Sequence, residues 1–328
     1  MIYPVFGFIK VCYSAQMIFK DAQALMTKLV FLFAVLMQPG LLQAQDIEPR
    51  RWSHLPVGLN VLGVGLASSS GDILFDPVLL IEDATYDLSL AGLSYVRAFD
   101  LLSKTARLDI IAPFAKGRWD GLLNGVDTVV RRQGMADPWL RFSVNLYGAP
   151  ALKGKEFMQY QSENRIKTTI GAGLGVRAPL GQYSSDYLIN LGNNRWVFRP
   201  QLGVLHQRNK WQFELTGSVF LYQTNKEFWK GGVRKQDPLW FLQSHAIYDI
   251  NQQWWTSLSF GFAYGGRSTI NDQPKDDDAR TSFMAIGLGF NISRSQGLKV
   301  SYLRSRTNIS VGTDTNTFSL GWSYRWAN

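Results

Sequence analysis

The histidines are the first place to look for chemistry in this chain, because serine and cysteine nucleophiles are commonly activated by a histidine base. There are three: His54, His206 and His245. His54 precedes the first expected strand, and His206 falls at an expected turn. His245 directly follows Ser244, and neighbours in a strand point to opposite faces, so these two cannot form a nucleophile–base pair. The pattern therefore predicts that the chain is not an enzyme.

Metal and cofactor chemistry has equally little support. The run DDDA, 276–279, could ligate a hard cation in a loop, but a solvated acidic tip is the simpler explanation. The only cysteine, Cys12, lies ahead of a targeting segment, so the exported chain would have no disulfide and no thiolate ligand. The glycine patterns GVGLAS and GAGLGV lack a following helix and are strand glycines. We expect no cofactor and no metal.

Cationic residues recur inside otherwise apolar segments. A charge that faces lipid at mid-depth costs roughly 2–4 kcal/mol, so we expect these residues to face an interior or to lie near its rims. A basic interior favours anions and repels cations. Alternatively, the cations pair with acids such as Asp109 and Glu214 and fill the interior; both explanations are open at this stage. The candidates for the solute path are Arg97, Arg107, Arg141, Lys167, Arg177, Arg199 and Glu214.

The segments that carry these cations alternate in polarity, as half-apolar β-strands do. In WQFELTGSVFLY, 211–222, Trp211, Phe213 and Leu215 share one face, with a gap at Gly217. In IKTTIGAGLGVR, 166–177, the face opposite the apolar one holds cations and three glycines. The sequence predicts strands at 57–69, 85–99, 104–116, 137–149, 165–178, 195–206, 210–223, 238–250, 253–265, 280–293, 298–307 and 314–326.

Strands of this kind build either a soluble sandwich or a membrane barrel. Charged residues are only 18% of the chain, aromatics recur near strand ends, and the links alternate between short and long. The link 151–164 breaks the alternation and is predicted to be a small periplasmic helix, whereas 121–135 and 265–279 are predicted to be long loops. These features favour an all-β fold, a transmembrane antiparallel β-barrel of about 12 strands of the bacterial outer-membrane type.

The N-terminal region indicates export. From Met26 the sequence has a positive residue at Lys28, a short apolar run over 29–37 and small residues near 44. This is typical of a cleaved signal peptide, whereas a membrane anchor would need a longer apolar stretch. We therefore expect 1–44 to comprise an upstream extension and a signal peptide, and 45–328 to form a single barrel domain in the outer membrane.

The final strand, SLGWSYRW at 319–326, resembles the C-terminal signal of outer-membrane barrels. Gly321, Tyr324 and Trp326 have the expected spacing, although Ala327 and Asn328 follow the terminal aromatic. The resemblance implies the barrel-assembly machinery as a partner. It also implies that the last strand turns its apolar face to outer-membrane lipid.

Two further motifs resemble the meta-pathway of phenol degradation family. The first is Pro-x-Gly-x-Asn near the start of the barrel; the second is a central Ala-Pro-x-Gly-x-Tyr motif that continues to a tryptophan and a proline. The motif residues are Pro56, Gly58, Asn60, Pro179, Gly181, Tyr183, Asn190, Gly192, Asn194, Trp196 and Pro200. The resemblance implies an outer-membrane transporter or channel, often linked to catabolism of aromatic compounds, with no catalytic residues.

The expected function is therefore a channel or transporter for small solutes, aromatic or anionic compounds among them, through a basic lumen. The alternative is a closed structural or surface-interaction barrel. Gly171, Gly173 and Gly175, expected to face inward, favour the open lumen. Nucleic acid is not an expected partner despite the net charge of +9, because the basic residues are scattered over the strands.

Overall fold

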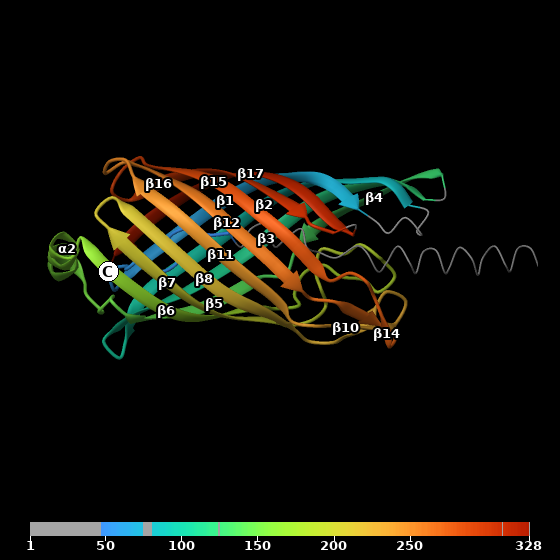
Figure 1. Cartoon of the computed structure of the whole chain (residues 1–328), viewed down its shortest axis with the longest axis horizontal. Coiled ribbons are helices and arrows are strands. Elements are labelled where there is room, and N and C mark those ends of the chain that lie inside the picture. The colour runs from blue at the N-terminus through green and yellow to red at the C-terminus, as the bar shows by residue number, and fades with distance from the viewer. Residues whose placement is uncertain (1–46, 75–80, 124, 310, 328) are drawn as a thin grey trace, which may run out of the picture.

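Twelve long, tilted strands lie side by side and form the wall of a barrel (Figure 1). The computed structural model describes residues 47–74, 81–123, 125–309 and 311–327; the predicted signal peptide and Cys12 lie outside them. The barrel strands are β1 (Leu59–Leu74), β2 (Ile81–Leu101), β3 (Lys104–Leu123), β5 (Trp139–Tyr147), β6 (Ile166–Arg177), β7 (Val197–Arg208), β8 (Trp211–Tyr222), β11 (Leu239–Asp249), β12 (Trp254–Gly265), β15 (Ala279–Asn291), β16 (Gln296–Thr307) and β17 (Gly312–Ala327).

The barrel closes because its last strand pairs with its first. Every neighbouring pair is antiparallel, and β17 lies between β1 and β16, with Gly321 opposite Gly65. Both edges of the final strand are thus hydrogen-bonded, and its apolar side chains, such as Phe318 and Leu320, face outward. The predicted all-β, 12-strand antiparallel barrel is confirmed.

The polarity of each strand follows from its two environments. Apolar side chains point outward, where lipid surrounds a membrane barrel; Leu202, Trp240 and Phe260 are examples. Small and polar side chains point inward and are mostly buried, as the alternating pattern of β8 shows. Because side chains alternate with period 2, this division is set residue by residue along each strand.

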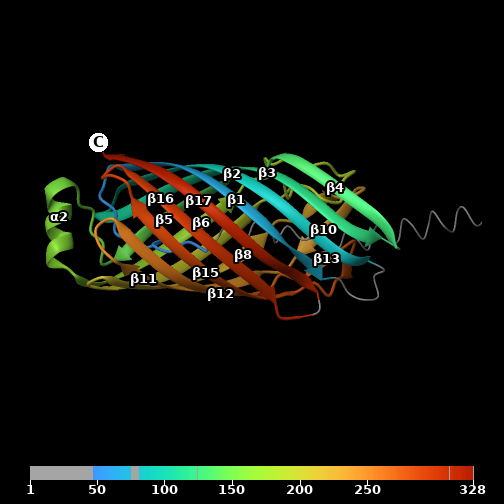
Figure 2. The ribbon, with the colours of Figure 1, turned by 90° about the horizontal axis from the view of Figure 1, so that it is seen from above.

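The two ends of the barrel differ. The end called the inner end carries the short turns, the C-terminus and the helix α2 (Gly154–Glu163), which confirms the predicted small helix (Figures 1 and 2). Short turns face the periplasm in barrels of this type. The opposite, outer end carries β4 (Val126–Met135) and a second sheet. That sheet consists of β9 (Asn225–Phe228), β10 (Gly232–Gln236), β13 (Ser268–Ile270) and β14 (Gln273–Pro274).

The prediction of long loops at 121–135 and 265–279, at the outer end, is wrong in part. Residues 121–123 form the end of β3 and residues 126–135 form β4, and these two segments pair with each other beyond the barrel wall. A positive φ at Gly125 permits the tight reversal between the two strands. The loop 265–279 contains β13 and β14. No helix in the described ranges is long and apolar enough to cross a membrane.

Candidate functional site

A segment that precedes the first strand runs into the lumen. Residues 47–58, here called the plug, are anchored at the inner end, where the Val57 amide donates to the Leu152 carbonyl at 2.8 Å and the Gly58 amide to Ala98 at 3.0 Å. From there the chain turns inside the barrel. Its side chains contact inward-facing residues of several strands, so it occupies the space that a solute would cross.

Trp52 holds the plug against the wall. Its indole is 1% exposed, and its Nε1 donates to Thr216 Oγ1 at 2.8 Å. A Cβ atom added to Gly171 would lie 2.2 Å from the Trp52 ring, and one added to Gly203 would lie 1.9 Å from it. Glycines on β6 and β7 therefore provide the slot for this side chain.

The inward glycines of β6 do not leave the lumen open, and this expectation is wrong. Gly171 faces Trp52, and Gly175 faces Trp139, whose ring would lie 2.9 Å from an added Cβ. The sequence shows that these positions are small, but the side chains that fill the space come from elsewhere in the chain. Their role is close packing, not an open passage.

Three arginines surround one carboxylate beside the plug and form what we call the inner cluster. Asp109 is contacted by Arg51 of the plug at 2.5 Å, by Arg107 at 2.5 Å and by Arg141 at 3.3 Å. Arg141 also reaches Glu48 of the plug at 2.8 Å. Asp109 is 2% exposed. Two carboxylates of the protein thus offset most of the charge of the three arginines and leave one positive charge over.

Other polar contacts fix the same part of the plug. Arg51 Nη2 donates to Ser143 Oγ at 3.0 Å, and the Arg51 backbone amide donates to Glu214 Oε1 at 3.2 Å. Arg50 forms an ion pair with Asp249. The plug is therefore bound by individual side-chain contacts to β3, β5, β8 and β11, without being a strand of the wall.

His54 joins the plug to the helix at the inner end. Its Nε2 donates to the Pro150 carbonyl at 2.7 Å, and its Nδ1 accepts from Gln161 Nε2 at 3.2 Å. Phe157 and Tyr160 pack edge-on against the ring. Burial lowers the pKa of His54 to about 4, so the imidazole is neutral at neutral pH.

At the outer end, a second group of arginines lies over aromatic rings. The outer cluster consists of Arg177 over Trp139 at 4.5 Å, Arg195 over Tyr222 at 4.6 Å and Arg234 over Phe228 at 5.4 Å from guanidinium carbon to ring centroid. Just below it, Arg199 lies over Phe220 at 4.5 Å and donates to Ser218 Oγ at 3.1 Å.

Residues 178–196 cover part of the outer opening and contain most of the central motif. Asp137 accepts from the amides of Gly181 at 2.9 Å and Asn193 at 2.8 Å. A Cβ on Gly181 would meet the Asp137 backbone at 2.6 Å, which explains the glycine. Farther along, the side chains of Ile189 and Leu191 are buried against inward-facing residues of β2 and β3, namely Tyr86, Leu88, Leu90 and Trp119.

Six of the seven predicted path residues face inward, and the seventh does not. The inward-facing ones are Arg107, Arg141, Lys167, Arg177, Arg199 and Glu214, all buried or partly buried. Arg97 instead lies exposed on the outer face near the inner end, because its neighbour Ala98 takes the inward position. For Arg107 and Arg141 the pairing explanation holds, since both contact Asp109.

Sequence reasoning missed four interior residues: Arg51, Trp52, Arg195 and Arg234. Arg51, Trp52 and Arg234 lie outside the predicted strands, and Arg195 is the first residue of the predicted strand 195–206, so alternation gives little signal for any of them. The run Arg50-Arg51-Trp52, immediately ahead of the first strand, was the available clue for the plug. A bulky aromatic between charged residues in a presumed linker is unusual, because exposed linkers are mostly small and polar.

A row of polar residues in the wall has the composition of a catalytic triad but not its geometry. Glu214, His245 and Ser259 are cross-strand neighbours, and His245 Nδ1 lies 2.8 Å from Ser259 Oγ. Glu214 accepts the Arg51 amide and has no hydrogen bond to His245 among the described contacts. In the described ranges, no group of three or more acidic, histidine or cysteine side chains is arranged to hold a metal ion.

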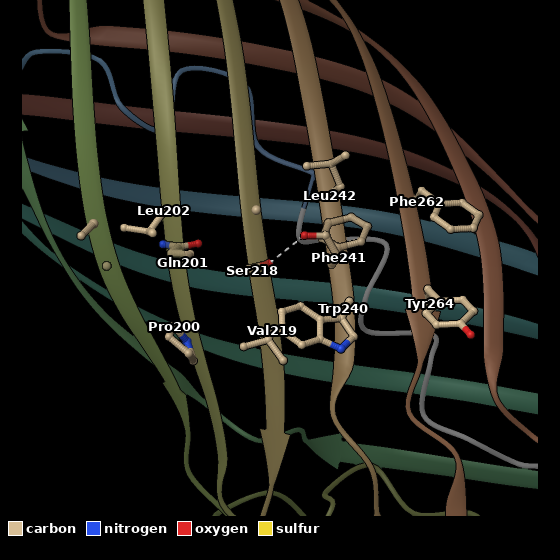
Figure 3. A pocket seen from close by; sticks show the side chains of 13 residues that line it. Pro200, Gln201, Leu202, Ser218, Val219, Trp240, Phe241, Leu242, Phe262 and Tyr264 are labelled. Atoms are coloured by element: carbon tan, nitrogen blue, oxygen red, sulfur yellow. Dashed lines mark hydrogen bonds between the residues drawn. The ribbon is translucent and has the colours of Figure 1, made fainter.

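A hollow of about 650 Å³ lies in the barrel wall over β6, β7, β8, β11 and β12 (Figure 3). Gly217, which has open space beside it, lies at the hollow, and Val219, Trp240 and Tyr264 line it. Pro200 lacks an amide hydrogen and cannot donate to a neighbouring strand. The residue pairing of β7 with β8 is interrupted there, between the pairs Phe198–Leu221 and Gln201–Ser218. The hollow is lined mainly by lipid-facing side chains.

Comparison with known proteins identifies one matching family and several solved structures of similar fold. Residues 51–326 match the family described as "Putative MetA-pathway of phenol degradation". An outer membrane channel from Pseudomonas putida F1 has a similar fold, with a TM-score of 0.73, 20% identity, and coverage of 85% of this chain and 100% of that chain. The β-domain of the Bordetella autotransporter BrkA reaches a TM-score of 0.48 at 11% identity, covering 81% of this chain and 99% of its own. No curated protein matches significantly.

The comparison confirms the family resemblance and the barrel of the bacterial outer-membrane type, and with it the predicted location in the outer membrane. The match begins at residue 51, so it includes the Arg51 and Trp52 positions of the plug as well as the wall. Both motifs singled out in the sequence lie within it. Residues 51–58 of the plug are therefore part of the region that the family model describes.

Proposed function

The chain belongs to the MetA-pathway of phenol degradation family, and from this premise we propose that it is an outer-membrane channel for small solutes, anionic and aromatic compounds among them. The observation that carries the proposal is the lumen itself, which presents cations and aromatic rings inward along its length. A basic lumen lowers the barrier for anions. The similar fold of a known outer membrane channel supports the same conclusion.

The plug is the element that must move for solutes to pass. Its contacts are one indole in a glycine slot, a few ion pairs and single hydrogen bonds. The wall is held separately, because each of its twelve strands pairs antiparallel with both of its neighbours and β17 closes against β1. Displacing the plug would therefore clear a passage through the lumen and leave the pairing of the wall strands intact.

The second candidate is a closed barrel without transport activity. It is favoured by the plug, which enters the lumen from the inner end, and by residues 178–196, which cover part of the outer opening. A closed barrel would act through its outer sheet and its surface. The two candidates differ in whether ions cross the folded protein once the plug is loosened.

Conductance in planar lipid bilayers separates them. We expect small anion-selective steps from the unaltered protein and larger steps from Trp52→Ala. Neutralising Arg177 and Arg199 should then reduce the anion selectivity. Arg306→Gln, which changes an outward-facing charge, serves as the matched control. If folded Trp52→Ala protein passes no current at any voltage, the channel is rejected in favour of the closed barrel.

A further inference from the structure

The outer cluster brings together three buried arginines from separate parts of the chain. Arg177 ends β6, Arg195 precedes β7, and Arg234 lies in β10 of the outer sheet. Their exposed fractions are 5%, 3% and 6%. Arg177 pairs with Val197, which places Arg195 two residues away on the neighbouring segment. A fold that gathers three buried like charges needs a compensating partner.

The protein supplies only part of that partner. The aromatic rings contact the flat faces of the guanidinium groups, and these faces carry no N–H donors. In the plane of the groups, Arg195 Nη2 donates to Gln236 Oε1. Among the described residues, Arg177 Nε and Nη2, Arg195 Nη1, and Arg234 Nε and Nη2 have no hydrogen-bond acceptor. Five buried donor atoms thus point edge-on without a protein oxygen to receive them.

The surrounding charges leave the cluster positive. None of the three arginines forms an ion pair with a carboxylate in the part of the chain that the structure describes. Asp277 is the acid that acts on Arg234, and both of its oxygens already accept from Ser268. Burial lowers the pKa of Arg195 to about 9, and the neighbouring Arg234 and Arg177 charges act in the same direction. An anion here would relieve this repulsion.

An apolar surface adjoins the arginines on the lumen side. Val197, Phe220, Leu239, Phe241 and Phe283 form one buried cluster, against which Trp139 and Tyr222 of the arginine stacks also pack. Ile47 of the plug lies in this cluster. The interior therefore already accepts an apolar side chain from a segment outside the wall. A ligand that combined an anionic end with an apolar body would match both surfaces.

We propose that the outer cluster is a binding site for an organic monocarboxylate, whose carboxylate accepts from Arg177, Arg195 and Arg234 and whose apolar body lies on the Phe220–Phe241–Phe283 surface. Guanidinium groups bind carboxylates through paired, in-plane N–H donors. Such a pair, Nε and Nη2, is open on Arg177 and on Arg234, and Arg195 adds Nη1. The inference deepens the proposed channel function. A role of this site in transport rests on that function, whereas binding at the site does not. It also makes Ile47 of the plug a competitor for the same apolar surface.

Isothermal titration calorimetry on the folded full chain in detergent tests the site without reference to conduction. The probes are 3-phenylpropanoate and its neutral amide, 3-phenylpropanamide. We expect saturable binding of the carboxylate and at least about tenfold weaker binding of the amide, because charge-assisted hydrogen bonds are lost. Arg195→Gln should weaken carboxylate binding by a similar factor. Arg195→Lys should restore only part of the affinity, because an ammonium on a flexible stem does not reproduce the in-plane donor of a guanidinium that is fixed over Tyr222.

Lys235→Gln is the matched control. Lys235 follows Arg234 on the same strand and carries the same charge, but it is exposed and pairs with Asp272. Its substitution should change binding less than twofold. Equal weakening by Lys235→Gln and Arg195→Gln would overturn the proposal, since a diffuse charge effect would then explain the binding. Equal affinity for acid and amide would overturn it too.

Two further outcomes are decisive. If sulfate displaces 3-phenylpropanoate at equal concentration, the site recognises a compact oxyanion and the apolar surface has no part in it. If neither the full chain nor Trp52→Ala binds the carboxylate, there is no such site even with the plug loosened. Binding without conductance would leave the site standing and reject the channel, whereas conductance without binding would do the reverse.

Discussion

The inner and outer arginine clusters contain the same kind of residue, yet among the residues that the structure describes only the inner cluster contacts carboxylates of the protein. In the inner cluster, Arg51, Arg107 and Arg141 converge on Asp109. In the outer cluster, Arg177, Arg195 and Arg234 lie on aromatic rings, and several of their donor atoms have no acceptor among the described residues. The comparison teaches that the arginines of a basic lumen can have two separate roles. Those of the inner cluster bind the plug, whereas those of the outer cluster are suited to an anionic ligand.

The largest expected effect comes from breaking the inner cluster. Asp109→Asn keeps the shape of the side chain but leaves three buried arginines without their common counter-charge. We expect a loss of about 3–5 kcal/mol in the free energy of unfolding, as when one partner of a buried ion pair is removed. Urea unfolding of the barrel in lipid vesicles, followed by tryptophan fluorescence, measures it. Asp314→Asn, at an outward-facing pair, is the control, and equal losses in the two variants would contradict the explanation.

A second substitution tests how the plug itself is held in the lumen. Trp52→Ala removes a buried indole, a change that costs about 3–5 kcal/mol where the site cannot collapse. Here the loss should weaken plug docking while the wall stays folded. Trypsin should then cut at Arg50 and Arg51 faster than in the unaltered protein. Trp211→Ala, at an exposed indole on the outer face, should leave this cleavage unchanged.

Methionine substitutions in the two clusters should change the free energy of unfolding differently. Arg141→Met removes a partner of Asp109 and Glu48, so we expect it to destabilise the protein by about 2–3 kcal/mol. Arg177→Met keeps an apolar stem on Trp139 and removes a buried charge that has no carboxylate partner, so stability should change by less than about 1 kcal/mol or rise. Equal destabilisation by both, in the same urea titration, would remove the distinction.

The smallest effect concerns pH at the inner end. The pKa of His54 is about 4 in the folded protein, below its ordinary value of 6.5, so the folded state binds fewer protons between these values. The stabilising contribution is complete above about pH 6.5 and is lost as the pH falls toward 4. We expect the unfolding midpoint in urea to decrease over this window, and to decrease less in His54→Gln. A midpoint with the same pH dependence in both proteins would show that His54 is not responsible.

Alternation along the strands made the wall predictable. The predicted strands 165–178 and 210–223 agree with β6 and β8 to within one residue at each end. The agreement follows because lipid on one face and a polar interior on the other impose a period of 2 on every strand. The final strand was recognised for the same reason, since its apolar face needs only lipid. The extension of β3 into β4 was missed, because beyond the membrane no lipid imposes a period of 2. There, apolar and charged residues share one exposed face, as Val129, Arg131 and Met135 do.

The sequence by itself determined the class of the molecule: its wall strands, the lipid-facing side of the last strand and the inward position of most cations, since each of these depends on local alternation. Only the tertiary structure decided what those cations contact. Trp52 enters the slot formed by Gly171 and Gly203, and Arg51 reaches Asp109, across separations of 58 to 151 residues along the chain. Such contacts depend on which strands close around which segment, and no periodicity in a single strand contains that information.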